Sequence, residues 1–200
     1  INHVYQTFRF FKTKDIPLNI PENYILHIGS FEKRKDLMTL VKAFHFLKKD
    51  NLKLVLAGAQ VLNGNKKVIK KVKKYILKNN LVEKVILPGF ISQEESKVYY
   101  KNASIYVFPS IDEGFGIPIL EALSFSIPTI CSDIKVFKEI GNNSVEFFKA
   151  GDPNSLASKI RFLLNNEDTR KKLAKNGLQH IKKFNRKNFI KGFEEFILNE

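Results

Sequence analysis

Short apolar runs alternate with segments of helical periodicity along most of the chain. Each run is only a few residues long, which favours buried β-strands: Tyr24–Ile28, Leu52–Ala57, Val85–Leu87, Ile105–Phe108, Thr129–Cys131 and Val145–Phe147. Between them, helical spacing of apolar residues predicts helices near 37–47, 66–78, 94–101 and after residue 116. Six strands joined by helical crossovers indicate an α/β, Rossmann-like, doubly wound parallel sheet.

The last quarter of the chain is predicted to be helical. Asp152 and Pro153 are typical of a helix start, and two further helices are expected near 167–183 and 186–198. Residues 1–20 contain no complete element, so we interpret them as a linker that enters a single domain over residues 21–200. This start also suggests that the chain is half of something larger.

Composition excludes several classes of protein. With 44% hydrophobic and 12% aromatic residues, the 200-residue chain can form a sizeable core and is not expected to be disordered. No apolar stretch approaches the roughly 18–20 residues that span a bilayer. A single cysteine, Cys131, excludes an internal disulfide and favours a reducing compartment, so we expect a cytoplasmic protein.

The formal net charge of +14 favours an anionic partner. Most of the excess is lysine, whereas nucleic-acid readers favour arginine for bidentate contacts, so no nucleic-acid partner is expected. Lysines concentrate in the predicted helix 66–78, around apolar positions. Two interpretations remain open there: an ordinary solvated helix face, or peripheral contact with an anionic membrane.

The segment Ser110–Ala122 carries the most chemistry. It places Glu113 in a glycine-flanked loop and Glu121 eight positions later, on the helix that follows. The strand Ile105–Phe108 comes just before, so the segment lies at a strand's carboxyl end, where ligands bind parallel sheets and a helix N-terminus attracts anions. Two glutamates beside an anion site indicate a ligand with hydroxyls and phosphate, such as a nucleotide-sugar.

Several motifs together resemble one known family, the retaining GT-B glycosyltransferases of family four, in their C-terminal donor-binding domain. The motifs are Ile28–Lys35, Leu54–Gly58, Leu87–Phe90, Phe108–Ser110 and Glu113–Glu121. The resemblance implies a domain that holds a nucleoside diphosphate sugar, whose hexosyl unit passes to a sugar or lipid-linked acceptor. It also implies a separate N-terminal acceptor domain, which this chain lacks, so the chain alone is expected to be inactive.

The loop after the first strand is predicted to bind the diphosphate. Lys35 and Arg34 lie where an ammonium and a guanidinium reach phosphate oxygens, unless they form a solvated basic turn. The family often has an arginine where this chain has Ser30, so that phosphate ligand is either missing here or replaced by Arg34.

The glycine-rich turn is predicted to approach the ligand with its backbone. Gly114 and Gly116 have no side chain to obstruct it, and the free amides of Phe115, Gly116 and Ile117 would meet phosphate. Pro118 suits the first helical turn, where its missing N–H has no partner to lose.

Each glutamate has a predicted role. Glu121 should accept hydrogen bonds from the ribose hydroxyls, and Glu113 from the donor sugar. By resemblance, Glu113 is also catalytic and stabilises charge at the anomeric carbon. The alternatives are a helix-capping Glu113 and a solvent-facing Glu121. Phe90 and Ile91 are candidates for packing near the base, with a core role for Phe90 as the alternative.

No metal or cofactor is expected. The chain has no Asp-x-Asp pair, and its four histidines lack ligand spacing: His3, His27, His45 and His180. We expect His27, within a strand, to be a packed core residue. Two other functions stay open: a non-catalytic nucleotide-sugar-binding subunit, and a nucleotide-sugar epimerase of GT-B fold.

Overall fold

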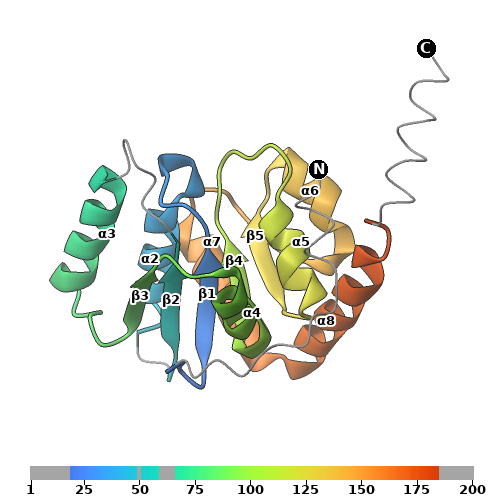
Figure 1. The fold of residues 1–200 in the computed structure, drawn as a ribbon, viewed down its shortest axis with the longest axis horizontal. Coiled ribbons are helices and arrows are strands. Elements are labelled where there is room, and N and C mark those ends of the chain that lie inside the picture. Colours follow the sequence, from blue (N-terminus) through green and yellow to red (C-terminus); the bar gives the residue numbers. More distant parts are fainter. Residues whose placement is uncertain (1–18, 49–50, 59–65, 185–200) are drawn as a thin grey trace, which may run out of the picture.

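A six-stranded parallel sheet forms the centre of the computed structural model, which describes residues 19–48, 51–58 and 66–184 (Figure 1). The strands are β1 (Tyr24–Ile28), β2 (Lys53–Ala57), β3 (Val85–Gly89), β4 (Ile105–Phe108), β5 (Thr129–Ser132) and β6 (Glu146–Phe148). Their spatial order is β3-β2-β1-β4-β5-β6, and every neighbouring pair is parallel. The predicted doubly wound α/β sheet is confirmed.

The helices are α2 (Leu37–His45), α3 (Lys66–Lys78), α4 (Gln93–Asn102), α5 (Ile117–Ser124), α6 (Lys135–Gly141), α7 (Pro153–Asn165) and α8 (Glu167–Ile181), with 3-10 turns η1 (Lys33–Lys35) and η2 (Asn142–Ser144). The sequence pattern did not predict α6, because seven residues are too few to show a helical period. The expected helix at 186–198 and most of the expected linker lie outside the described residues. Within the described ranges, no helix is long and apolar enough to cross a membrane.

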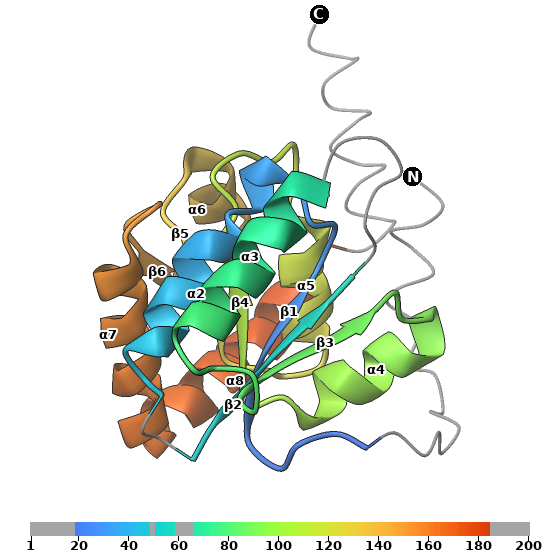
Figure 2. The ribbon, with the colours of Figure 1, turned by 90° about the vertical axis from the view of Figure 1, so that its left-hand side faces the viewer.

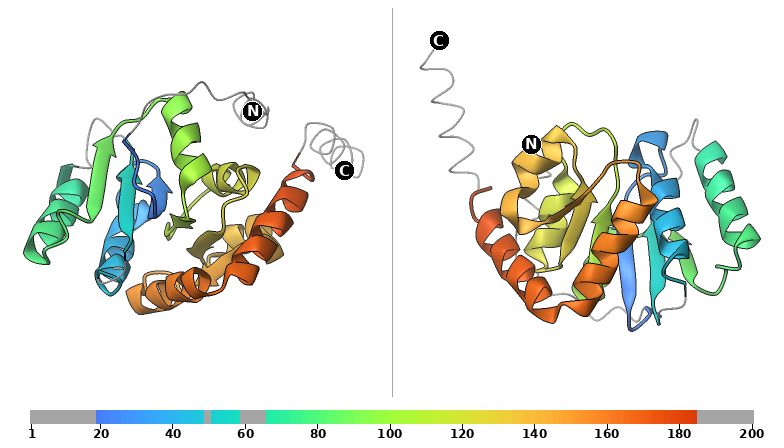
Figure 3. Two further views of the ribbon diagram at one scale, coloured as in Figure 1. Left: turned by 90° about the horizontal axis from the view of Figure 1, so that it is seen from below. Right: turned by 180° about the vertical axis from the view of Figure 1, so that it is seen from behind.

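Helices cover both faces of the sheet (Figure 3). Alternate strand residues enter two separate core clusters, because successive side chains of a strand point to opposite faces. On β4, Ile105 and Val107 pack with α2, α3 and α7, whereas Tyr106 and Phe108 pack with α4 and α5. All four β4 side chains are therefore buried, which explains the continuous apolar run.

The carboxyl ends of β1 and β2 approach closely enough to require glycine. Gly58 has a φ of 149°, and a Cβ on it would fall 1.8 Å from the carbonyl oxygen of Gly29. The Gly29 amide meanwhile donates to the Ala57 carbonyl at 3.0 Å. Any side chain at residue 58 would push these two strand ends apart.

The strand order places a switch point between β1 and β4. The chain leaves β1 toward α2 on one face and leaves β4 toward α5 on the other. Connections that diverge in this way leave a crevice at the carboxyl edge, where doubly wound sheets bind ligands. The loops that follow β1 and β4 meet at this edge.

Candidate functional site

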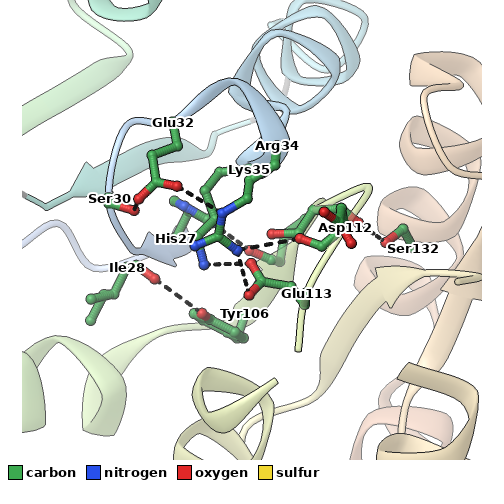
Figure 4. Close-up of polar contacts among 12 residues, drawn as sticks. His27, Ile28, Ser30, Glu32, Arg34, Lys35, Tyr106, Asp112, Glu113 and Ser132 are labelled. Atoms are coloured by element: carbon green, nitrogen blue, oxygen red, sulfur yellow. Dashed lines mark hydrogen bonds and ion pairs between the residues drawn. The ribbon is translucent and has the colours of Figure 1, made fainter. Parts of the chain in front are cut away.

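A carboxylate and two cations meet where these loops face each other (Figure 4). Lys35 Nζ lies 2.5 Å from Glu113 Oε1, and Arg34 Nη1 lies 2.6 Å from Glu113 Oε2. The Lys35 and Glu113 side chains are only 8% and 10% exposed. Lys35 also lies 4.8 Å from the ring centroid of Phe108. Lys35 is therefore a buried ion-pair partner, and the solvated-turn interpretation is wrong for it.

A second carboxylate holds Arg34. Glu32 Oε2 accepts from Arg34 Nε at 2.7 Å, and Ser30 Oγ donates to Glu32 Oε1 at 2.5 Å. The backbone adds a bond from the Ile111 amide to the Arg34 carbonyl at 2.8 Å. Ser30 therefore supports Arg34 through Glu32, a contact that the sequence motif alone did not indicate.

The cations keep Glu113 ionised in spite of its burial. Burial raises the pKa of Glu113, but hydrogen bonds from Lys35 and Arg34 outweigh it and leave that pKa below its ordinary value. The same bond from Arg34 to Glu113, followed by its bond to Glu32, raises the pKa of Arg34. Two cations and two carboxylates thus stabilise one another at the edge of the sheet.

His27 lies beside this cluster, from within β1. It is fully buried, with Nδ1 at 3.0 Å from the Val107 carbonyl oxygen, while Nε2 has no hydrogen-bond partner in the described part of the chain. Burial first, and the nearby Lys35 to a lesser degree, lower the pKa of His27 to about 4, although the Val107 bond opposes this. His27 is a packed, neutral residue at pH 7, as expected, and it adjoins the site.

Gly116 opens the first turn of α5. Its φ of 95° is left-handed, which favours glycine, and a Cβ there would also lie only 3.2 Å from a Phe137 ring carbon, so the ring would have to shift. No side chain caps the helix, and Pro118 occupies its first turn as predicted. In the described residues, the amides of Phe115, Gly116 and Ile117 donate no hydrogen bond. The turn offers unpaired N–H groups at the positive end of a helix dipole.

Glu121 lies one helical turn further along α5. It is mostly buried, and Tyr100 Oη, from α4, donates to its Oε2 at 3.1 Å. Burial raises the pKa of Glu121, and the Tyr100 bond opposes this. Glu121 is therefore not a solvent-facing residue, and Glu113 does not cap α5, because Gly116 holds the N-cap position. Tyr100 is a site neighbour that sequence reasoning missed.

Comparison with known proteins identifies the family. The sequence model described as "Glycosyl transferases group 1" matches residues 9–180. The chain belongs to this family. It is similar to an uncharacterised glycosyltransferase of Methanocaldococcus jannaschii, with 33% identity over 85% of this chain and 46% of that protein. It is also similar to the O-antigen chain mannosyltransferase RfbU of Salmonella typhimurium, with 31% identity over 70% of this chain and 38% of that one.

A solved structure shows the same fold. It is the C-terminal domain of a group 1 glycosyltransferase, LpcC, from Francisella tularensis, with a TM-score of 0.71 and 23% identity over 80% of this chain and 83% of that one. This chain therefore has the fold of a GT-B C-terminal domain. The chain spans less than half the length of the two curated relatives.

Two predicted residues of this group 1 glycosyltransferase chain lie apart from the charged cluster. Phe90 and Ile91 follow β3, which β2 separates from β1. Phe90 is 78% exposed, so the alternative of a core role is wrong. Ile91 is partly buried against the core cluster on the α4 side. No other atom of the described residues lies within 4 Å of where a Cβ on Gly114 would stand, so there is open space beside its backbone.

No metal-binding arrangement is present among residues 19–48, 51–58 and 66–184, since no three His, Cys, Asp or Glu side chains gather there. Cys131 is buried in the core, and burial raises the pKa of its thiol. The expectation that the reaction needs no metal stays a prediction.

Proposed function

We propose that the chain is the nucleotide-sugar donor-binding domain of a retaining glycosyltransferase, which transfers a hexosyl unit to a sugar or lipid-linked acceptor. The observation that carries this proposal is the ion-paired cluster of Glu113, Lys35 and Arg34 beside the open first turn of α5. Membership of the group 1 family and similarity to a mannosyltransferase support a hexosyl donor.

The diphosphate is expected to replace the Glu113 carboxylate as the partner of Lys35 and Arg34. Its oxygens would accept from Lys35, Arg34 and the amides of Phe115, Gly116 and Ile117, which combine two cations with a helix N-terminus. Glu113 would then lose its present partners to the phosphates. Its carboxylate would become available to the sugar hydroxyls and to the positive charge that develops at the anomeric carbon.

The ribose is expected to bind Glu121. Tyr100 already donates to one carboxylate oxygen, so the carboxylate has a fixed orientation and offers the other oxygen to a ribose hydroxyl. Because Glu121 is largely buried, its charge is costly without a ligand, and hydroxyl donors would offset that cost. This role needs no metal and no cofactor besides the donor itself.

We further propose that the acceptor site lies outside this chain, on a separate N-terminal domain, in an enzyme that acts in the cytoplasm. The chain's coverage of under half of two relatives supports this division. The 200-residue chain should therefore bind a nucleoside diphosphate weakly and transfer no sugar. Robust transfer by the purified chain would overturn the division.

A thermal-shift screen of the chain against UDP, GDP, ADP and their sugars tests donor binding, because a ligand of the native state raises the midpoint of unfolding. We expect one nucleotide class to raise it and the others not to do so. If none does, donor binding by this domain is wrong. In the complete protein, binding without transfer would favour the non-catalytic subunit, and interconversion of the free nucleotide-sugar would favour the epimerase.

A further inference from the structure

Helix α3 carries an unusual concentration of exposed positive charge. Seven of its thirteen residues are lysines, and all seven are exposed: Lys66, Lys67, Lys70, Lys71, Lys73, Lys74 and Lys78. The helix contains no acidic residue, and none of these lysines forms an ion pair within the described ranges. Within the described residues, no carboxylate pairs with these seven ammonium groups, so their charge is left to solvent ions.

The lysines share one side of the helix. At about 100° per residue they occupy a little under half of the circumference, opposite the buried Ile69, Val72 and Ile76. Leu77 falls inside the same arc and is 66% exposed. We name these seven lysines and Leu77 the lysine face of α3.

The lysine face points away from the rest of the molecule. In Figure 1, α3 is the outermost helix beside the β3 edge of the sheet, and Figure 2 shows it in front of α2 with no other described element covering it. Its buried side joins the core cluster of α2 and β2, so the lysine face is the side left open. The charged cluster around Glu113 lies elsewhere, between β1 and β4.

This arrangement does not help the helix to form. Lys66 and Lys67 lie in the first turn, where cations oppose the helix dipole. Lysines three or four residues apart, such as Lys70 and Lys74, repel one another on the helix surface. An anionic surface alongside α3 would relieve both effects at once.

We propose that the lysine face of α3 binds the surface of an anionic lipid bilayer. A row of flexible ammonium groups suits a flat layer of lipid phosphates, which needs no fixed fork geometry. The exposed Leu77 among the lysines would enter the interface between headgroups and acyl chains, as the apolar residue of an interfacial helix does. A nucleic-acid surface would reward arginines, and α3 has none.

The test is sedimentation of the purified chain with vesicles of phosphatidylcholine, alone or mixed with phosphatidylglycerol. We expect binding to the mixed vesicles only, weakened by added NaCl because salt screens the attraction. Replacing Lys70, Lys71, Lys73 and Lys74 by Gln should weaken binding on the order of a hundredfold or more, since each lysine near such a surface contributes roughly fivefold. Leu77→Gln should weaken it severalfold without any change of charge.

A charge-matched control replaces four exposed lysines of other helices by Gln: Lys101, Lys138, Lys172 and Lys175. It should leave most of the vesicle binding intact. Glutamine and lysine have similar helix propensities, so both variants should fold, and their thermal midpoints verify this. If the four-residue α3 variant did not fold, Leu77→Gln and the double variant at Lys70 and Lys74 would carry the same test.

Three results would each overturn the proposal. The first is equal binding, or no binding, to the neutral and the anionic vesicles. The second is an equal loss in the control variant, which would assign the effect to net charge. The third is that the α3 substitutions weaken binding of a DNA or RNA oligonucleotide but leave vesicle binding unchanged. None of these results depends on whether the domain binds a nucleotide, so the two proposals can fail separately.

Discussion

Two basic regions of the chain hold positive charge in opposite ways. Beside β1, Lys35 and Arg34 lie 2.5 and 2.6 Å from oxygens of the buried carboxylate of Glu113. On α3, seven lysines stand in solvent with no carboxylate among them. A cation that is buried and oriented is set for one ligand in one geometry, whereas mobile surface cations suit an extended anionic surface.

The largest expected effect comes from the removal of an oriented cation. Lys35→Ala should weaken nucleoside diphosphate binding by on the order of ten- to a hundredfold, because a charge-assisted contact worth roughly 1.5–3 kcal/mol is lost. Calorimetry measures it, with Lys33→Ala as the matched control, since Lys33 lies in the same turn and is exposed. Equal affinities in the two variants would remove the distinction between the buried and the exposed lysine.

Glu113→Gln tests whether the carboxylate is the partner of Lys35 and Arg34 only while no phosphate is bound. It leaves Lys35 buried without its counter-charge, so we expect the free energy of unfolding to fall by about 1–2 kcal/mol. The bare diphosphate should bind at least as tightly as before, and it should restore most of the lost stability, because its oxygens replace the carboxylate. In the complete enzyme, transfer should slow sharply.

Asp112→Asn, an exposed neighbour, is the control for this variant. The pKa of Glu113 is lowered in the folded state, so its contribution is present above the unfolded pKa and is lost as pH falls through the folded pKa. Wild type and Glu113→Gln should therefore converge in acid. If Glu113→Gln instead abolished diphosphate binding in a folded protein, the carboxylate would support the phosphate loop and would not face the sugar.

Glu121→Gln is expected to separate binding from stability. It should weaken the diphosphate and the nucleotide-sugar alike, by about tenfold, because the ribose is common to both. The pKa of Glu121 is raised by burial, so its ionisation opposes folding as pH rises through the folded pKa. The variant should thus be more stable at pH 7, on the order of 1 kcal/mol, and equal to wild type in acid.

Thermal melts over a pH series and the two titrations measure both effects. Glu139→Gln is the control, because Glu139 is exposed on α6. Loss of only the nucleotide-sugar, with the diphosphate unaffected, would exchange the roles proposed for Glu121 and Glu113.

The smallest expected effect is the change in nucleotide affinity when lysines of the lysine face of α3 are replaced. Gln at Lys70, Lys71, Lys73 and Lys74 should change diphosphate affinity by less than about twofold, because α3 lies beside the β3 edge of the sheet and the charged cluster around Glu113 lies between β1 and β4 (Figure 1). Salt screens exposed charges over roughly 10 Å. The same variant should melt slightly higher, because each like-charged pair that is removed relieves a few tenths of a kcal/mol. If calorimetry showed that the folded variant no longer binds nucleotide, the lysine face would belong to the donor site and the two regions would not be functionally distinct.

Much of the fold and part of the site followed from the sequence. Apolar runs three to six residues long, separated by segments of helical periodicity, predicted six buried strands, and the described residues form six. The glycines and Pro118 placed the start of α5, because backbone preferences are local. The same local pattern placed Glu113 in the loop before α5 and Glu121 on the helix itself.

Only the tertiary structure decided which groups pair. Lys35 and Glu113 are 78 positions apart, and they meet because β4 lies directly beside β1, an adjacency that periodicity does not encode. The strand order likewise sets Phe90 apart, and the packing of α4 on α5 brings Tyr100 to Glu121. The sequence by itself determined the order of the strands along the chain, most of the helices and the turn that starts α5, because these depend on local patterns. The burial of Lys35, the exposure of Phe90, the pKa values and the ion pairs depend on neighbours that only the folded sheet supplies.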